Sequence, residues 1–177
     1  VYKYPQTRKK AMKAKKVNLK FFPEGGNLVK GVPSQVAFEA TDAYGNPITL
    51  FGRIINRRKE EIGHFATIHE GRGVFTYIPT GEDADKAEVE LGGKKYRFDL
   101  PEVCSQGYVL HVDNLTSEDS IAVSVQKNTY TPSNLLGLAV IAHGKLLNSC
   151  LLNVGKNTPV SFKLDKSEWT PGVVQLV

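Results

Sequence analysis

The chain has 177 residues, of which 41% are apolar, and a formal net charge of +5. No apolar run approaches the roughly 20 residues that a membrane-spanning helix needs, and no segment near the start has the apolar centre of a signal peptide. The length is generous for one β-sandwich and sufficient for two small ones. Because the chain begins with Val1 rather than an initiator methionine, we expect it to be a mature or excised piece of a larger protein.

The positive charge is concentrated at the start of the chain. The first twenty residues carry eight of the 23 lysines and arginines and no acidic residue, so residues 21–177 are mildly acidic. A short basic arm can bind nucleic acid or anionic lipid, but such a run is more often a solvated linker. We therefore interpret residues 1–16 as a basic linker or arm. In the rest of the chain the aromatic residues do not interleave with lysine and arginine, so we expect no nucleic-acid binding.

Residues 17–101 have the pattern of a first β-sandwich domain. Apolar and polar residues alternate with the period of two that is typical of strands. The clearest such segments are residues 36–41, 87–91 and 96–100. Gly92-Gly93 predicts a two-residue hairpin, because tight turns there need positive φ. Further turns are predicted at residues 42–47 and at Gly71-Arg72-Gly73. The pattern predicts about seven short strands with the turn spacing of immunoglobulin-like sandwiches.

Residues 102–177 predict a second domain of about six strands. The same alternation recurs in residues 108–113, 121–126 and 160–165. A hairpin is predicted around His143-Gly144. The last strand, residues 173–177, ends without a turn, which suggests that one or two further strands are missing. The predicted fold class is therefore all-β, with two consecutive immunoglobulin- or fibronectin-like sandwich domains, the second incomplete.

Several segments resemble a known family. In the first half they are residues 21–29 (FFPEGGNLV), 36–42 (VAFEATD) and 71–75 (GRGVF), the last ahead of Ile78-Pro79. They resemble the macroglobulin-type sandwich domain of large Bacteroidetes envelope proteins, which are similar to bacterial α2-macroglobulins. Residues 108–114 and 169–173 resemble the following domain of the same proteins. The resemblance implies a location outside the cytoplasm, in the periplasm or at the outer membrane or cell surface.

The resemblance has an alternative and a departure. Residues 42–48 (DAYGNPI) would equally suit the bacterial immunoglobulin-like repeats of intimin-type adhesins. The thioester motif with which macroglobulins trap proteases, Cys-Gly-Glu-Gln, is absent, as is a long bait-like loop. Any inhibitory function is therefore not carried by this piece alone.

No arrangement of reactive side chains points to catalysis. The four histidines share no metal-ligand spacing; they are His64, His69, His111 and His143. The acidic clusters at residues 60–61 and 82–85 could hold calcium, but acidic turns are usually solvated and no EF-hand-like loop is present. No Gly-x-Ser-x-Gly motif occurs. We predict that the chain is not an enzyme and has no catalytic, cofactor-binding or metal-binding residues and no cofactor.

The two cysteines leave two possibilities open. Cys150 has the same strand parity as Leu146, Leu152 and Val154, so we expect it to face the core as a small apolar residue. Cys104 lies at the entrance to the second domain. In an exported chain the two could form a disulfide, but sequence alone gives no distance between them.

These observations predict a non-catalytic structural and binding module of a bacterial periplasmic or cell-surface protein. Its expected partners are adjacent modules of the same protein, and another protein or a glycan is an alternative. Attachment to a membrane is expected only through parts outside this chain. The competing hypotheses are an adhesin segment, an accessory domain of a hydrolase, and a non-catalytic part of a protease-trapping macroglobulin or an outer-membrane transport system. A cluster of exposed aromatic residues would favour glycan binding.

Two regions carry structural expectations of their own. Few contacts are expected to cross the junction at residues 100–105, which should then be the weakest point of the folded body. The last strand should expose an unguarded hydrogen-bonding edge. We expect another chain, the basic arm or, in the parent protein, the residues that follow to complete this edge. The alternative is a frayed last strand on an adequate core.

Overall fold

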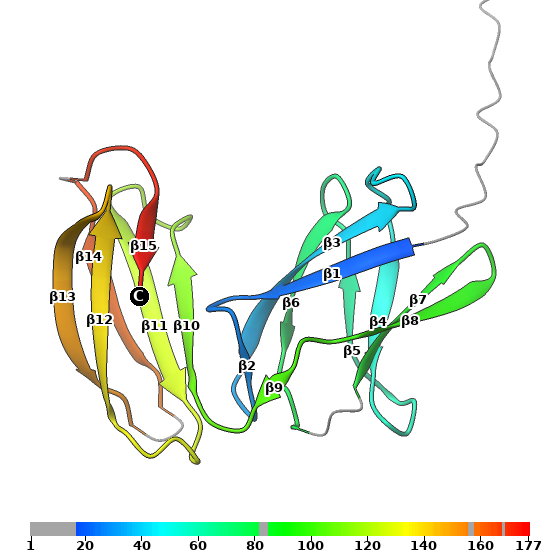
Figure 1. The fold of residues 1–177 in the computed structure, drawn as a ribbon, viewed down its shortest axis with the longest axis horizontal. Coiled ribbons are helices and arrows are strands. Elements are labelled where there is room, and N and C mark those ends of the chain that lie inside the picture. The colour runs from blue at the N-terminus through cyan, green and yellow to red at the C-terminus, as the bar shows by residue number, and fades with distance from the viewer. Residues whose placement is uncertain (1–16, 82–84, 156–157, 168) are drawn as a thin grey trace, which may run out of the picture.

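The computed structural model describes residues 17–81, 85–155, 158–167 and 169–177. All fifteen regular elements in these ranges are β-strands, so the predicted all-β class is confirmed. The strands form two β-sandwiches that lie side by side (Figure 1). Within the described ranges, no helix has the length and apolar character needed to cross a membrane. The predicted basic arm, residues 1–16, lies outside the described residues.

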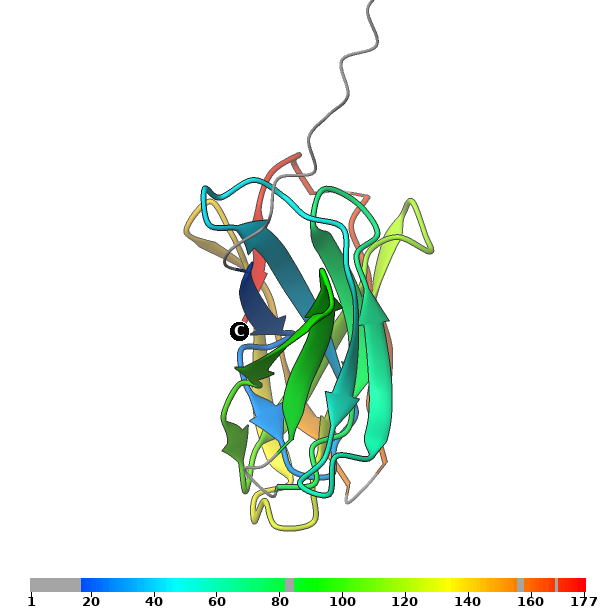
Figure 2. The ribbon, with the colours of Figure 1, turned by 90° about the vertical axis from the view of Figure 1, so that its right-hand side faces the viewer.

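The first sandwich packs a three-stranded sheet against a four-stranded sheet. The three-stranded sheet has the order β1 (Val17–Pro23), β3 (Ser34–Asp42), β6 (Arg72–Tyr77). The four-stranded sheet has the order β5 (Glu61–Ala66), β4 (Phe51–Ile55), β7 (Lys86–Leu91), β8 (Lys94–Asp99). All neighbours are antiparallel. The seven strands of these two sheets equal the number expected from the sequence. Figure 2 shows the molecule with this sandwich facing the viewer.

Aromatic side chains fill the centre of the first sandwich. Phe38 and Phe65 are almost fully buried, and their ring centroids lie 4.9 Å apart in an edge-to-face arrangement. Phe75 stacks on Phe65 at 5.3 Å. Gly52 makes room for this packing, because a Cβ atom there would lie 2.3 Å from Cζ of Phe65. The alternation seen in the sequence therefore becomes an aromatic core between two sheets.

The second sandwich packs two three-stranded sheets together. One has the order β10 (Tyr108–Asp113), β11 (Ser120–Lys127), β14 (Val160–Asp165). The other has the order β13 (Lys145–Asn153), β12 (Leu135–Ala142), β15 (Val174–Leu176). Its buried core is aliphatic and includes Val123, Val125 and Val140. The six strands equal the number predicted from the sequence.

Both predicted hairpins occur as expected, and a further predicted turn is displaced. Gly92 and Gly93 both have positive φ and join β7 to β8, while His143 and Gly144 do the same between β12 and β13. The third turn was predicted at residues 71–73. In the structure the positive φ angles belong to Glu70 and Gly71, and β6 already begins at residue 72. The prediction was one residue too late because Gly73 is part of the strand.

The two sandwiches share one topology and differ by one strand. In chain order, the first, second and fifth long strands of each form one sheet, and the fourth, third and sixth form the other. In the first sandwich a seventh strand, β8, continues the second sheet beside β7. In the second sandwich β15 is the sixth strand, and no described residue pairs with its outer edge.

Candidate functional site: the joint and the apolar sheet face

The linker between the sandwiches is held against the first one. β2 (Leu28–Val29) pairs in parallel with β9 (Val103–Cys104). The Lys30 amide donates to the Cys104 carbonyl at 2.9 Å, and Val103 packs against the first core. By its contacts β9 therefore belongs with the first sandwich, and the chain passes to the second between Cys104 and Tyr108.

An apolar contact joins the two sandwiches directly. Val29 and Val32 of the first sandwich and Val109 of β10 form a small buried cluster. Gly107 allows this approach, because a Cβ atom there would lie 3.0 Å from Cγ2 of Val29. Alternation along β10 places Val109 on the face directed away from the core of the second sandwich. This outward-facing valine was a signal in the sequence that was not recognised as a contact site.

A carboxylate crosses the same joint. Glu24 lies in the turn after β1, and its Oε1 accepts a hydrogen bond from the Val112 amide at 2.8 Å. Its other oxygen, Oε2, lies 2.6 Å from Nδ1 of His111. Glu24 thus binds the outer edge of β10, the first strand of the second sandwich. Of the four histidines considered in the sequence, only His111 lies at the joint, where it contacts Glu24 of the other sandwich.

A buried lysine organises the loop that completes the joint. The Lys127 side chain is fully buried and donates from Nζ to the Thr131 carbonyl at 2.8 Å, the Ser133 carbonyl at 2.9 Å and Asn134 Oδ1 at 2.6 Å. The loop so held carries Asn128, whose amide donates to the carbonyls of Lys30 and Ser105 at 3.1 and 2.8 Å.

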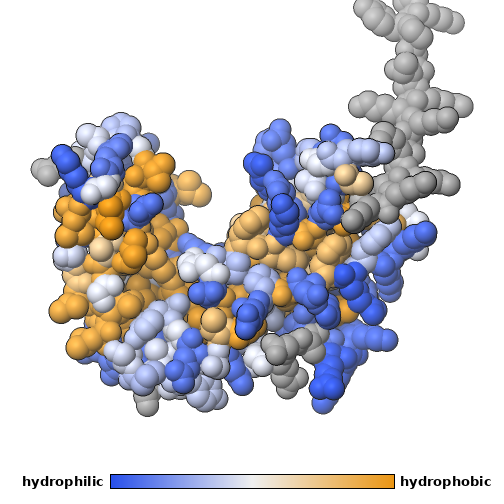
Figure 3. Space-filling view, viewed as in Figure 1, coloured by the Kyte–Doolittle hydropathy of each residue, from blue (hydrophilic) through white to orange (hydrophobic). Residues whose placement is uncertain are grey.

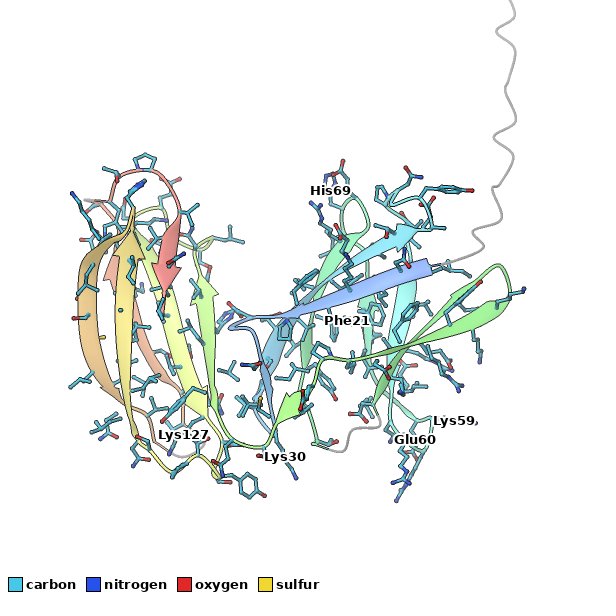
Figure 4. All side chains as sticks on the ribbon, viewed as in Figure 1. Phe21, Lys30, Lys59, Glu60, His69 and Lys127 are labelled. Carbon is cyan, nitrogen blue, oxygen red and sulfur yellow. The ribbon has the colours of Figure 1, made fainter. Side chains whose placement is uncertain are left out.

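The hydroxyl of Thr131 in the same loop also bonds to both backbone groups of Gly107. Figure 4 shows Lys127 and Lys30 on the same side of the molecule, on either side of the junction. The contacts that cross between the sandwiches are the apolar cluster and a set of side-chain hydrogen bonds, whereas the pairing of β2 with β9 holds the linker to the first sandwich. That the junction is the weakest point of the folded body stays a prediction.

The second sandwich presents an apolar outer face. This face belongs to the sheet β13-β12-β15 and includes Leu135, Gly137, Ala139, Ile141, Leu151 and Val177, with the polar residues Ser149, Asn153 and Gln175 among them. Leu135, Leu151 and Val177 are 65%, 79% and 69% exposed. A shallow hollow of about 480 Å³ lies beside Gly137, and Figure 3 shows the predominance of apolar surface on this side of the second sandwich.

The corresponding sheet of the first sandwich carries charges on its outer face. Glu88 of β7 is only 4% exposed and is surrounded by three cations. Arg53 and Arg97 donate to its two oxygens at 2.6 and 2.9 Å, and Lys95 lies 3.7 Å away. The hydrogen bond from Arg53 and then that from Arg97 lower the pKa of Glu88 to about 2, against the opposing effect of desolvation.

The titratable residues singled out in the sequence do not gather. His64 stacks on Phe51, and His69 and His143 lie in separate turns. Glu60 accepts a hydrogen bond from Asn56 at 2.8 Å, and Asp85 accepts one from the Tyr77 hydroxyl at 2.6 Å. The other acidic residues of that second cluster, Glu82 and Asp83, lie outside the described residues. Across the part of the chain that the structure describes, no three histidine, cysteine or acidic side chains are grouped as metal ligands.

Both cysteines are unpaired. Cys104 is half-buried in β9. Cys150 lies opposite the buried Leu138, on the core side of its sheet as alternation predicts, but it is exposed, so the expectation that it packs in the core was wrong. Only Leu152 is buried within β13, because β13 is the outermost strand of its sheet and little of the sandwich covers it. In addition, the register of β12 and β13 shifts between Val140 and Ile141. Beyond this irregularity, alternation along β13 no longer predicts which side chains face the core.

Comparisons with known proteins give likenesses among solved structures only. No family model matches the chain, and no curated protein matches it. Among solved structures, the chain is similar to the native conformation of E. coli alpha-2-macroglobulin, with 14% sequence identity and a TM-score of 0.33. The likeness covers 85% of this chain and 12% of the E. coli chain, so this chain spans only a small part of that protein.

Proposed function

We propose that this chain is a non-catalytic scaffold and binding module of a larger macroglobulin-like protein outside the cytoplasm. The proposal rests on the contacts of the joint between the two sandwiches. The apolar cluster around Val109 and the bonds of Glu24 and Asn128 hold the two sandwiches together, and the pairing of β2 with β9 fixes the linker to the first sandwich. A spacer that fixes the direction of its neighbours needs such a joint, whereas independently moving domains typically share only small polar contacts.

The partners proposed for this scaffold are neighbouring modules of the same protein. The apolar outer face of the second sandwich supports this assignment, because contiguous exposed apolar surface is typical of protein contacts. The location outside the cytoplasm rests on the resemblance of residues 21–29, 36–42 and 71–75 to envelope-protein domains.

The adhesin alternative with a glycan ligand has no comparable support. Its expected mark is a cluster of exposed aromatic side chains. In the part of the chain that the structure describes, the exposed aromatic residues are Phe22, Tyr44, Phe51 and Tyr130. They lie on different elements, and among the described residues no ring contact joins any two of them.

NMR relaxation of the whole chain tests the scaffold proposal. We expect both sandwiches to tumble with one common correlation time. In Val109→Asp, a buried unpaired carboxylate disrupts the apolar cluster, and the two sandwiches should tumble separately and faster while each keeps its own fold. The matched control is Val74→Asp, at a strand position that is 49% exposed and away from the joint. Independent tumbling of the unaltered chain would refute the scaffold role.

A further inference from the structure

We propose that the outer edge of β15 binds an additional β-strand, antiparallel to β15, from a polypeptide segment outside these 177 residues. The added strand takes the place in the second sandwich that β8 has in the first. The proposal goes beyond the scaffold role and does not depend on it, because it concerns one edge of one sheet.

The topology that the two sandwiches share leaves a place for one more strand beside β15. In the four-stranded sheet of the first sandwich, β7 has β4 on one side and β8 on the other. β15 occupies the position of β7, with β12 on one side. On its other side the described residues supply no strand. Figure 1 shows this edge of β15 facing the space between the two sandwiches. The fold of the first half therefore specifies the place and the direction that a strand bound to this edge would take.

The backbone groups on the outer edge of β15 point away from the sheet. Val177 exchanges two hydrogen bonds with Ala139 of β12, at 3.0 and 2.8 Å. Because bonded and non-bonded pairs alternate along antiparallel strands, Val174 and Leu176 direct their N–H and C=O groups away from β12. These groups form a short template for a further strand, and such edges are the usual sites of β-augmentation.

The space beneath this edge of β15 could receive the side chains of a further strand. A hollow of about 300 Å³ lies between β15 and β10. Its apolar lining includes Val112, Ile121, Trp169, Val174 and Leu176. Of these, only Ile121 is buried, and the others are half-buried. The remaining lining residues are Asn114, Lys166, Thr170, Pro171 and Gly172, so the hollow offers polar as well as apolar contact. Lys166 is already bonded to Asn114 Oδ1 and the Ser117 carbonyl.

The first sandwich shows what fills the equivalent space. Tyr96 and Phe98 of β8 pack against the first core together with Leu19 and Phe21 of β1. These two side chains are two residues apart and so lie on the same face of β8. We infer that the strand bound by β15 likewise carries two large apolar side chains two residues apart, with polar residues between them on the solvent side.

The test extends the whole chain with its own β8 sequence. Adding Thr-Gly-Gly-Lys-Lys-Tyr-Arg-Phe-Asp-Leu after Val177 copies the turn between β7 and β8, whose register pairs Val89 with Tyr96. In the extension the tyrosine should lie opposite Leu176 and the phenylalanine opposite Val174. We expect the unfolding midpoint of the second sandwich to rise by roughly 5 °C or more. Hydrogen exchange at the Leu176 amide should slow by about tenfold or more, because the amide gains a partner.

The matched control omits the initial threonine. A one-residue slip turns both aromatic side chains to the solvent face, so this extension should give little of either effect. If the two extensions stabilise the chain equally, or if neither does, the proposed edge is wrong.

Two other occupants are distinguished with the unextended chain. Sedimentation velocity should show a monomer, and a dimer that the threonine-containing extension dissociates would make a second copy the occupant. Removal of residues 1–16 should leave exchange at Leu176 unchanged. Faster exchange after this removal would make the basic arm the occupant, and either result would overturn the assignment to an outside segment.

Discussion

The two sandwiches use one topology for surfaces of opposite chemistry. In the first, the outer face of the sheet β5-β4-β7-β8 carries Arg53, Glu88 and Arg97 in a charged cluster. In the second, the corresponding sheet carries exposed Leu135 and Leu151. A charged face remains solvated at little cost, whereas an exposed apolar face gains free energy when another surface covers it. The outer face of the first sandwich is therefore stable in water, whereas that of the second is suited to contact with another surface.

The sandwiches also differ at their cores and edges. The first contains buried aromatic rings and a complete four-stranded sheet. The buried apolar side chains of the second are aliphatic, and the aromatic residues packed against them, Tyr108, Phe162 and Trp169, are only half-buried. We expect the first sandwich to be the more stable of the two, and the following variants test this comparison from the largest effect to the smallest.

The largest effect is expected in the aromatic core. Phe38→Ala removes a ring that is 2% exposed and contacts both Phe65 and Phe75. The resulting cavity should lower the free energy of unfolding of the first sandwich by about 4 kcal/mol. Urea unfolding measures this loss. Phe22→Ala, on the neighbouring strand and 52% exposed, should cost less than about 1 kcal/mol. Equal losses in the two variants would contradict the assignment of the core.

The next effect concerns the buried cation of the second sandwich. Lys127→Met keeps the aliphatic stem but leaves the acceptors on Thr131, Ser133 and Asn134 without their donor. Hydrogen bonds to charged groups contribute about 1.5–3 kcal/mol each, so we expect the second sandwich to lose about 3 kcal/mol. Thermal unfolding should show a lower midpoint for the second sandwich.

The exposed residue Lys163 on β14 provides the matched comparison. Lys163→Met should change stability by less than about 0.5 kcal/mol. A Lys127 variant as stable as this control would show that the loop folds without its central cation, and the joint would then need another explanation.

A smaller effect is expected at the charged face of the first sandwich. Glu88→Gln removes the charge that Arg53, Arg97 and Lys95 surround, and the cost should be about 2 kcal/mol. The pKa of Glu88 is depressed from 4.5 to about 2, so the unfolded state binds this proton first as the pH falls. The stabilisation is complete above pH 4.5 and disappears between pH 4.5 and about 2.

Unfolding measured from pH 7 to pH 2 checks the sign of this dependence. The difference between the unaltered chain and Glu88→Gln should shrink as the pH falls through that window. The exposed neighbour on the same strand, Glu90→Gln, should show little difference at any pH. A difference between the unaltered chain and Glu88→Gln that grows on acidification would contradict the assigned ion pairs.

Much of the fold could be predicted because strands with one buried face alternate in sequence. The hairpin at Gly92-Gly93 was predictable because both residues need positive φ. The exposure of Cys150 was not, since parity identifies the face of a strand but not whether another layer covers it. That covering depends on β13 lying at the edge of its sheet, which is a property of the tertiary structure.

The joint was less predictable than the cores. Lys127 continues the inward-facing row of Ile121, Val123 and Val125, so a lysine in a buried row was a signal that could have been read. Val109, an apolar residue in the outward row of β10, was a second signal. Asn128 gave no comparable signal, because an asparagine in a loop is common and its partners, the carbonyls of Lys30 and Ser105, are identified only by the folded chain.

The smallest effect on stability is expected on the apolar outer face. Leu151→Ser changes a side chain that is 79% exposed and lines the hollow beside Gly137. Stability should change by less than about 0.5 kcal/mol, because no packed neighbour is lost. The chain should nevertheless bind less of a fluorescent apolar dye, since the variant interrupts contiguous apolar surface. Ile68→Ser, which alters a residue of the first sandwich that is 77% exposed in a turn, should leave dye binding nearly unchanged. Equal dye binding by the unaltered chain and both variants would show that the outer face is not a contact surface, and the difference between the two sandwiches would then lie only in the open edge of β15.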